Sequence, residues 1–152
     1  MDVYGKLKEL GFSLPVPPLV IGKFVPVKQI GSLAYLSGQG PIMDGKPVFV
    51  GKLGKDLTIE QGQEAARLCI LNLLSVLEAK IGDLNKVITV VKVLGFVASA
   101  PGFNDQPTVI NGGSQLLIDI FGERGKHARS AIGVNELPGN IPVEIEVIIE
   151  VV

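Results

Sequence analysis

The last quarter of the chain, residues 128–152, constrains the fold more than any other stretch. Two apolar, β-prone runs flank the break Leu137-Pro138-Gly139-Asn140, which predicts two strands joined by a hairpin turn. The second run alternates, with aliphatic residues facing one way and carboxylates the other: Val143, Ile145 and Val147 against Glu144 and Glu146. Such a strand buries one face, and its polar face meets water or lines a site.

Apolar periodicity and turn residues predict the other elements in chain order. We expect helices over 2–10, 58–80 and 107–121, and strands over 23–29, 33–37, 47–50 and 86–97. Residues 1–20 form an N-terminal extension, and the remaining β-β-β-α-β-α-β-β order predicts one α+β domain. In it, a mixed sheet carries two helices on one face.

The predicted sheet has a second face that needs a cover. Residues 87–93 are almost entirely apolar, so that strand has aliphatic side chains on both faces. Burial against copies of the same chain would cover them, and we predict a closed homo-oligomer. Gly112-Gly113 inside the last helix costs about 1 kcal/mol per residue relative to alanine. Either tertiary packing overrides that cost or the helix begins later.

Composition excludes several classes of function. The net charge is −1 with scattered Lys and Arg, which argues against nucleic-acid or membrane partners. One cysteine, no secretion signal and no apolar run of about 18 residues predict a soluble, cytoplasmic protein. One histidine and one cysteine make a metal site improbable, and the Gly51–Lys55 loop lacks a phosphate-binding or dinucleotide fingerprint. We therefore expect no cofactor.

Most polar residues with chemical potential have a plain structural interpretation. Cys69 lies on the apolar stripe of its helix and is expected in the core. His127 could act as a general base, but the polar loop before it predicts an ordinary exposed histidine. Ser37 and Ser130 have no recognisable Asp–His partners, which argues against a serine-hydrolase triad.

Arg129 is the exception, because it is a permanent charge near the start of a predicted strand. Its planar fork matches a carboxylate in two parallel hydrogen bonds. The alternative is an ion pair within the hairpin. The predicted register places Arg129 near Ile148, with Glu144 about 13 Å along the strand. We therefore expect another anion, either a ligand or a carboxylate from a neighbouring subunit.

Four segments together resemble the Rid (YjgF) family of enamine and imine deaminases. They are Ala34–Pro41, Gln63–Lys80, Val109–Asn111, and Arg129-Ser130 with Glu144 fifteen positions later. The resemblance implies a chorismate-mutase-like fold and a homotrimer with three clefts between subunits. It also implies cofactor-free hydrolysis of 2-aminoacrylate and 2-iminopropionate to 2-keto acids and ammonia.

The resemblance also implies roles for individual residues. Arg129 would clamp the substrate carboxylate, Glu144 would position or deprotonate water, and Asn111 would add a polar contact. Substrate binding would further involve Ser37, Gly38 and the backbone around Ala131.

The chain departs from the family pattern at two of these positions. Phe24 stands where many deaminating members have tyrosine, and Ala131 where many have cysteine. Both changes make the pocket more apolar and leave open which substrate it prefers. Three functions therefore compete: deamination of 2-imino acids, non-catalytic binding of a small 2-keto acid, and ribonuclease activity. The acidic pI of 5.8 and the few aromatic residues argue against the last.

Overall fold

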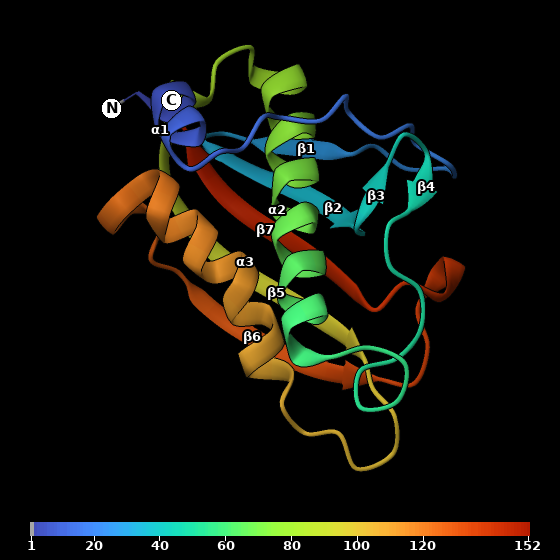
Figure 1. Ribbon diagram of the computed structural model, residues 1–152. Coiled ribbons are helices and arrows are strands. Elements are labelled where there is room, and N and C mark those ends of the chain that lie inside the picture. The colour runs from blue at the N-terminus through green and yellow to red at the C-terminus, as the bar shows by residue number, and fades with distance from the viewer. Residues whose placement is uncertain (1) are drawn as a thin grey trace.

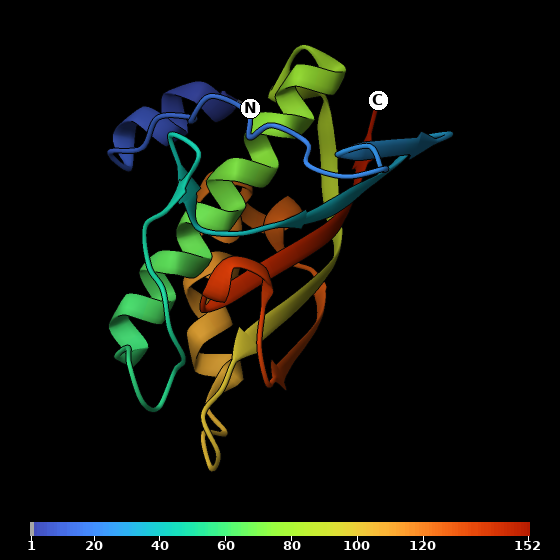
Figure 2. The same ribbon diagram turned by 90° about the vertical axis from the view of Figure 1, so that its right-hand side faces the viewer.

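The computed structural model describes residues 2–152 as a five-stranded mixed sheet with helices on one side (Figures 1 and 2). The helices are α1 (Val3–Glu9), α2 (Ile59–Ile81) and α3 (Gln106–Phe121). The main sheet contains β1 (Val27–Ile30), β2 (Leu33–Gln39), β5 (Val87–Ala98), β6 (Ala128–Val134) and β7 (Val143–Val151). A separate hairpin contains β3 (Ile42–Met43) and β4 (Lys46–Pro47). Short 3-10 turns are η1 (Leu84–Lys86), η2 (Gly122–Gly125) and η3 (Pro138–Asn140). No helix in residues 2–152 combines the length and apolarity needed to cross a bilayer.

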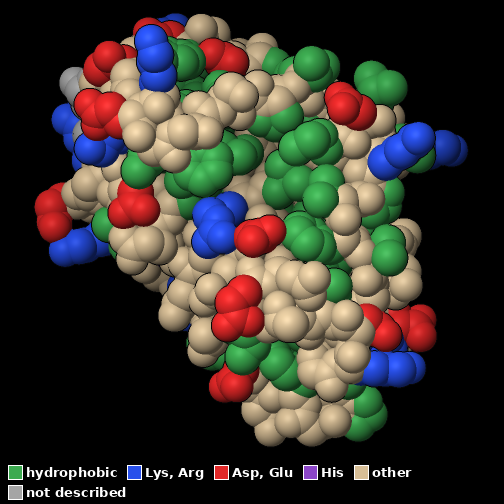
Figure 3. All heavy atoms as spheres, viewed as in Figure 1, with side chains coloured by type: hydrophobic (Ala, Val, Ile, Leu, Met, Phe, Trp, Pro, Cys, Tyr) green, Lys and Arg blue, Asp and Glu red, His purple; other side chains and the backbone are tan. Residues whose placement is uncertain are grey.

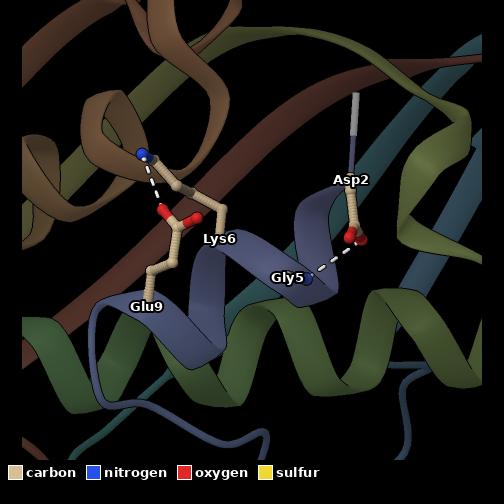
Figure 4. A network of polar contacts seen from close by, with 4 residues as sticks. All are labelled: Asp2, Gly5, Lys6 and Glu9. Atoms are coloured by element: carbon tan, nitrogen blue, oxygen red, sulfur yellow. Dashed lines mark hydrogen bonds and ion pairs between the residues drawn. The ribbon is translucent and has the colours of Figure 1, made fainter.

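The helices begin and end where the local sequence predicts. Thr58 and Gln61 form the reciprocal capping box of α2, and Gly82 ends that helix in a left-handed conformation. Asp2 caps α1 by accepting from the Gly5 backbone N–H at 2.9 Å (Figure 4). Lys6 forms an ion pair with Glu9 on the same helix (Figure 4).

Helix α1 packs into the domain core. Its Val3 and Leu7 side chains are buried and belong to the same apolar cluster as α2 and α3. The helical layer therefore has three members, one more than the two predicted.

The strand order β1-β2-β7-β5-β6 corrects the prediction for the end of the chain. The predicted final hairpin is wrong, because β5 lies between β6 and β7 and pairs with both. Strand β6 runs parallel to β5 and follows it through α3, a crossover that parallel neighbours require. The turn η3 then leads across the end of β5 into β7. The twelve-residue apolar strand β5 is thus hydrogen-bonded to a neighbouring strand along both of its edges.

The strand predicted over 47–50 is also wrong. Asp44 and Gly45, both with positive φ, turn the short β3–β4 hairpin, and only Pro47 of that range is a strand residue. The segment that follows is a loop leading to α2. Its Leu53 is fully buried and exchanges backbone hydrogen bonds with Ala98 and Ala100.

Close packing of α2 against α3 explains the two glycines in α3. A methyl group at Gly112 would overlap the carbonyl oxygen of Gln63 and lie 2.7 Å from its Cα. Only hydrogen fits between the two backbones at this point. Tertiary packing therefore overrides the weak helix propensity of glycine, and α3 begins at Gln106.

Within residues 2–152, no element covers the side of the sheet away from the helices (Figure 2). Tyr35, in register with Ile148, is 42% exposed on this face, and Ile132, in register with Phe96, is 44% exposed. A shallow cavity of about 280 Å³ lies here, lined in part by Tyr35 and Ile148. The second apolar face predicted from the sequence is therefore present.

Candidate active site

Arg129 on β6 points toward α3 and is held there by one nitrogen. Its Nη1 donates to Asn111 Oδ1 at 2.7 Å and to Ser114 Oγ at 3.2 Å. These two acceptors lie one helical turn apart on α3, so they fix the orientation of the guanidinium plane.

The other edge of the same guanidinium is open. Within residues 2–152, Nε and Nη2 of Arg129 donate no hydrogen bond, and no acidic side chain forms an ion pair with it. Two parallel N–H groups on a planar cation match the two oxygens of a carboxylate. Arg129 can therefore bind an anion without giving up its contacts to α3.

His127 lies beside this cluster and is half-buried, so the prediction of an ordinary exposed histidine is wrong. Its Nδ1 is 2.6 Å from the Gly125 carbonyl oxygen, which can only accept, so Nδ1 carries the proton. In the neutral ring Nε2 is then an acceptor, and the Ser114 hydroxyl donates to it at 2.9 Å. We refer to these two residues as the Ser114–His127 pair.

The surroundings of His127 favour this neutral form. Burial lowers the pKa of the imidazole, and the positive charge of Arg129 lowers it further. The hydrogen bond to the Gly125 carbonyl acts in the opposite direction but does not cancel them. The ring is therefore uncharged at neutral pH.

Sequence reasoning missed the Ser114–His127 pair, although two spacings indicate it. Arg129 and Ala131 are two residues apart on β6, and His127 directly precedes this strand at the same two-residue spacing, which is typical of side chains on one face. Ser114 follows Asn111 by three residues on a helix, so both project from neighbouring turns of one side. The sequence does not show that this side of the helix meets that face of the strand.

Asn111 and Ser114 open onto a groove on the helical side of the molecule, the side viewed in Figure 3. The groove has a volume of about 460 Å³, and Gln63 and Arg67 of α2 line it together with α3. Ser114 is 9% exposed, and its hydroxyl contacts Arg129 and His127, which do not line the groove. A small ligand there would meet groups that donate or accept hydrogen bonds.

The remaining predicted residues gather at the end of β2. Ser37 Oγ donates to the Val25 carbonyl at 2.7 Å and so ties down the loop that carries Phe24, whose ring is half exposed. Gly38 lies against Glu144, because a Cβ at Gly38 would be 3.0 Å from the Glu144 Cδ. Partial burial raises the pKa of Glu144, and the nearby Glu146 charge adds to the rise. A carboxylate with a raised pKa is a better proton acceptor.

The predicted residues therefore form two groups, which one chain does not bring together. The arginine half-site comprises Asn111, Arg129 and Ala131, and the carboxylate half-site comprises Phe24, Ser37, Gly38 and Glu144. Strands β2 and β6 are separated by β7 and β5, a distance of about 14 Å at ordinary strand spacing. Arg129 faces the helices, whereas Glu144 alternates with the buried residues of β7 and faces the uncovered side.

Two further sequence predictions concern cysteine and metals. Cys69 is fully buried in the core, as predicted, and burial raises the pKa of its thiol well above the usual value. Among residues 2–152, no three His, Cys, Asp or Glu side chains are grouped so as to hold a metal ion.

Comparison with known proteins supplies the family context. The family model described as YjgF/chorismate mutase-like, putative endoribonuclease, matches residues 5–149. Protein TCP17 of Trypanosoma cruzi is 40% identical over 149 residues, which cover 97% of this chain and 93% of that protein. A 2-iminobutanoate/2-iminopropanoate deaminase of Dermatophagoides farinae is 32% identical, covering 90% of this chain and 92% of the deaminase. The crystal structure of Atu1372 from Agrobacterium tumefaciens, a protein of unknown function, superposes with a TM-score of 0.93. It is 45% identical and covers 99% of this chain and 92% of its own.

Proposed function

The chain belongs to the YjgF/chorismate mutase-like family, which includes the Rid proteins, and on that premise we propose that it hydrolyses reactive 2-imino and 2-enamino acids. Suitable substrates are 2-iminopropionate and 2-aminoacrylate, and the products are a 2-keto acid and ammonia. The observation that carries the proposal is the open edge of Arg129. Asn111 and Ser114 fix one nitrogen, and two parallel donors remain for a substrate carboxylate.

The proposal includes a homotrimer whose clefts join the two half-sites. The arginine half-site of one chain would face the carboxylate half-site of its neighbour across each interface. The separation of Arg129 and Glu144 on opposite sides of the sheet supports this arrangement, as does the uncovered apolar face around Tyr35. Burial of that face would also provide the hydrophobic part of the interface.

The chemistry follows from the two half-sites. Arg129 would hold the carboxylate and so fix the position of the imine carbon, which converts a bimolecular attack into an oriented one. Glu144 would accept a proton from water as its oxygen bonds to that carbon, and would then protonate the amine. The raised pKa of Glu144 suits a group that both accepts and returns a proton.

Glu144→Gln tests this function against non-catalytic binding of a 2-keto acid. Glutamine keeps the size of the side chain but cannot accept a proton. Ammonia and pyruvate release from freshly generated 2-iminopropionate should fall at least about tenfold, in the range of lost acid–base catalysis. Pyruvate affinity, measured by calorimetry, should stay within about threefold, because the carboxylate is bound by Arg129. An unaccelerated reaction with the wild type would refute the deaminase proposal and favour the binding protein.

Gly38→Ala is expected to lower activity with little effect on folding. The backbone at Gly38 does not require positive φ, so alanine fits the strand. Its methyl group would meet the Glu144 side chain at about 3.0 Å, and the carboxylate would have to move. We expect kcat/KM to fall several-fold while the thermal midpoint shifts by less than about 4 °C, which corresponds to about 1 kcal/mol. Unchanged kcat/KM would show that the position of Glu144 does not limit the reaction.

A further inference from the structure

Helix α2 carries three buried side chains that reach backbone carbonyls of other segments. They are spaced three residues apart, which places neighbouring members on adjacent turns of the helix, over β2 and β7 (Figure 1). Cys69 Sγ lies 3.6 Å from the Val143 carbonyl oxygen. Asn72 Nδ2 donates to two carbonyls, and Ser75 Oγ donates to the Pro15 carbonyl at 2.6 Å. All three side chains are at most 1% exposed, so these contacts are part of the core.

Asn72 is the member of this row next to the carboxylate half-site. Its Nδ2 donates to the Gly40 carbonyl and to the Ile42 carbonyl, both at 2.9 Å. Both partners are carbonyl oxygens, which can only accept, so the amide has one possible orientation. The two carbonyls belong to the segment that directly follows Gln39, the last residue of β2. Asn72 therefore ties the end of β2 to α2.

Strand β2 has a bulge where it reaches the half-site. Its register with β7 shifts between Leu36 and Gln39, because these two residues are three apart on β2 and their partners are two apart on β7. The extra residue on β2 is a β-bulge, a feature that changes the direction of the backbone beside a site. Gly38 lies within it and is packed against Glu144, since a Cβ at Gly38 would be 3.0 Å from the Glu144 Cδ. The position of the bulge thus determines the space available to the carboxylate.

The other end of the Asn72 amide opposes folding. Its Oδ1 is buried and accepts no hydrogen bond within residues 2–152, and its neighbours on α2, Leu71 and Leu73, are apolar and buried. A buried acceptor without a donor lowers stability. The two bonds from Nδ2, in contrast, fix a backbone segment outside the helix. Such a departure from full hydrogen bonding in a core is typical of residues that serve a functional site.

We propose that Asn72 is a positioning residue of the carboxylate half-site, a proposal that rests on the hydrolysis proposed above. Asn72 does not touch the substrate. By holding the two carbonyls after β2, it keeps the bulge against Glu144 and so fixes the direction from which the carboxylate meets water. Ser37 holds the other side of the bulge through its hydrogen bond to the Val25 carbonyl. The bulge is thus fixed from both sides.

Asn72→Leu tests this role, and Ser75→Ala is its matched control. Leucine has the shape of asparagine but donates no hydrogen bond, so both carbonyls lose their partner. Ser75→Ala removes an equally buried bond from the next turn of α2, to a carbonyl outside the half-site. The thermal midpoint should fall by a similar amount in both variants, about 2–8 °C. We expect kcat for 2-iminopropionate to fall about 10- to 100-fold in Asn72→Leu and to stay within about twofold in Ser75→Ala. Pyruvate affinity should stay within about threefold in both, because Arg129 is unaffected.

Combination with Glu144→Gln separates positioning from general damage to the fold. If Asn72 acts through Glu144, its replacement has little left to remove once the proton acceptor is gone. The kcat of the double variant should then lie within about twofold of that of Glu144→Gln alone. Equal fold losses from Asn72→Leu in the two backgrounds would overturn the positioning role.

The carboxyl group of Glu144 gives a readout that does not depend on activity. In protein labelled with ¹³C at the glutamate carboxyl groups, the Glu144 signal is the one missing from Glu144→Gln. Burial holds the pKa of Glu144 above its usual value, and the charge of Glu146 adds to the rise. Asn72→Leu should lower this pKa toward the usual value, because a released bulge admits water to the carboxylate. Ser75→Ala should leave it unchanged.

Neither variant alters the charges near Glu144. The titratable side chains on β7 and on the elements packed against it are Glu146 and Glu150 on β7, Tyr35 on β2, Lys92 on β5 and, facing the sheet from α2, Cys69. Of these, Glu146 is the one whose charge shifts the pKa of Glu144. A change of this pKa in Asn72→Leu would therefore report a change in burial.

The two proposals fail in different ways. Wild-type hydrolysis with an unchanged kcat in Asn72→Leu would overturn the positioning role and leave the deaminase proposal intact. No wild-type hydrolysis would overturn the deaminase proposal, and the titration would then decide whether Asn72 sets the surroundings of Glu144. A Glu144 pKa that is the same in wild type and Asn72→Leu would overturn that placement. If Asn72→Leu does not fold, Asn72→Ala replaces it in each measurement, because the smaller side chain leaves room for water at the two carbonyls.

Discussion

Arg129→Ala is expected to lower kcat/KM for 2-iminopropionate by about 10²- to 10⁴-fold, the largest loss of activity at the site. Each hydrogen bond between charged partners contributes about 1.5–3 kcal/mol, and two are lost with the open edge of the guanidinium. The substrate carbon also loses its fixed position relative to the attacking water. Assays of ammonia release measure the loss of catalysis, and calorimetry with pyruvate measures the loss of carboxylate binding.

Arg129→Lys is the matched control for this prediction. Lysine keeps the positive charge but has one compact ammonium in place of a planar fork, so it cannot hold a carboxylate in two parallel bonds. We expect it to recover only part of the lost pyruvate affinity and little of kcat. Wild-type kcat/KM in Arg129→Ala would show that the substrate is bound elsewhere.

Gly112→Ala is expected to lower the free energy of unfolding by about 3 kcal/mol, although alanine is the better helix former. The intrinsic gain is about 1 kcal/mol. The added methyl would overlap the Gln63 carbonyl, and this obstacle is backbone within a packed helix, not the flexible end of a side chain. Overpacking of this kind forces α2 and α3 apart. The thermal midpoint should fall by about 6–12 °C, as measured by calorimetry.

Gly113→Ala provides the control from the next position. A Cβ there would be 3.0 Å from Ile70 Cγ1 and 3.2 Å from Ile145 Cδ1, both of which can shift. The nearest backbone atom, the Ala66 carbonyl oxygen, would be 3.3 Å away, a tight contact but not an overlap like that of Gln63 at Gly112. We expect a change of less than about 1 kcal/mol, because gained helix propensity offsets the repacking. Equal destabilisation by the two variants would contradict the explanation by backbone contact.

Local features of the fold were predicted correctly from the sequence, whereas the order of the strands was not. The capping box at Thr58, the end of α2 at Gly82 and the apolar stripe that includes Cys69 were all predicted, because each depends on residues within a few turns. The final hairpin was wrong, because two β-prone runs around a turn are compatible with direct pairing or with a strand between them. Only the burial of β5 selects between these arrangements.

The candidate site divides in the same way. The hairpin register that placed Glu144 out of reach of Arg129 was wrong, since β5 separates β6 from β7. The sequence by itself still predicted an anion at Arg129, because a guanidinium keeps its charge. The tertiary structure decided which residues surround it, since Ser114 and His127 meet Arg129 only through the packing of α3 over β6. It also decided that Glu144 on β7 lies away from Arg129 on β6, because β5 lies between these two strands. The alternation of β7 places Glu144 on the uncovered face of the sheet, whereas Arg129 faces α3. Contacts along the chain are encoded by nearby residues, whereas contacts across the sheet depend on which strand arrangement buries the most apolar surface.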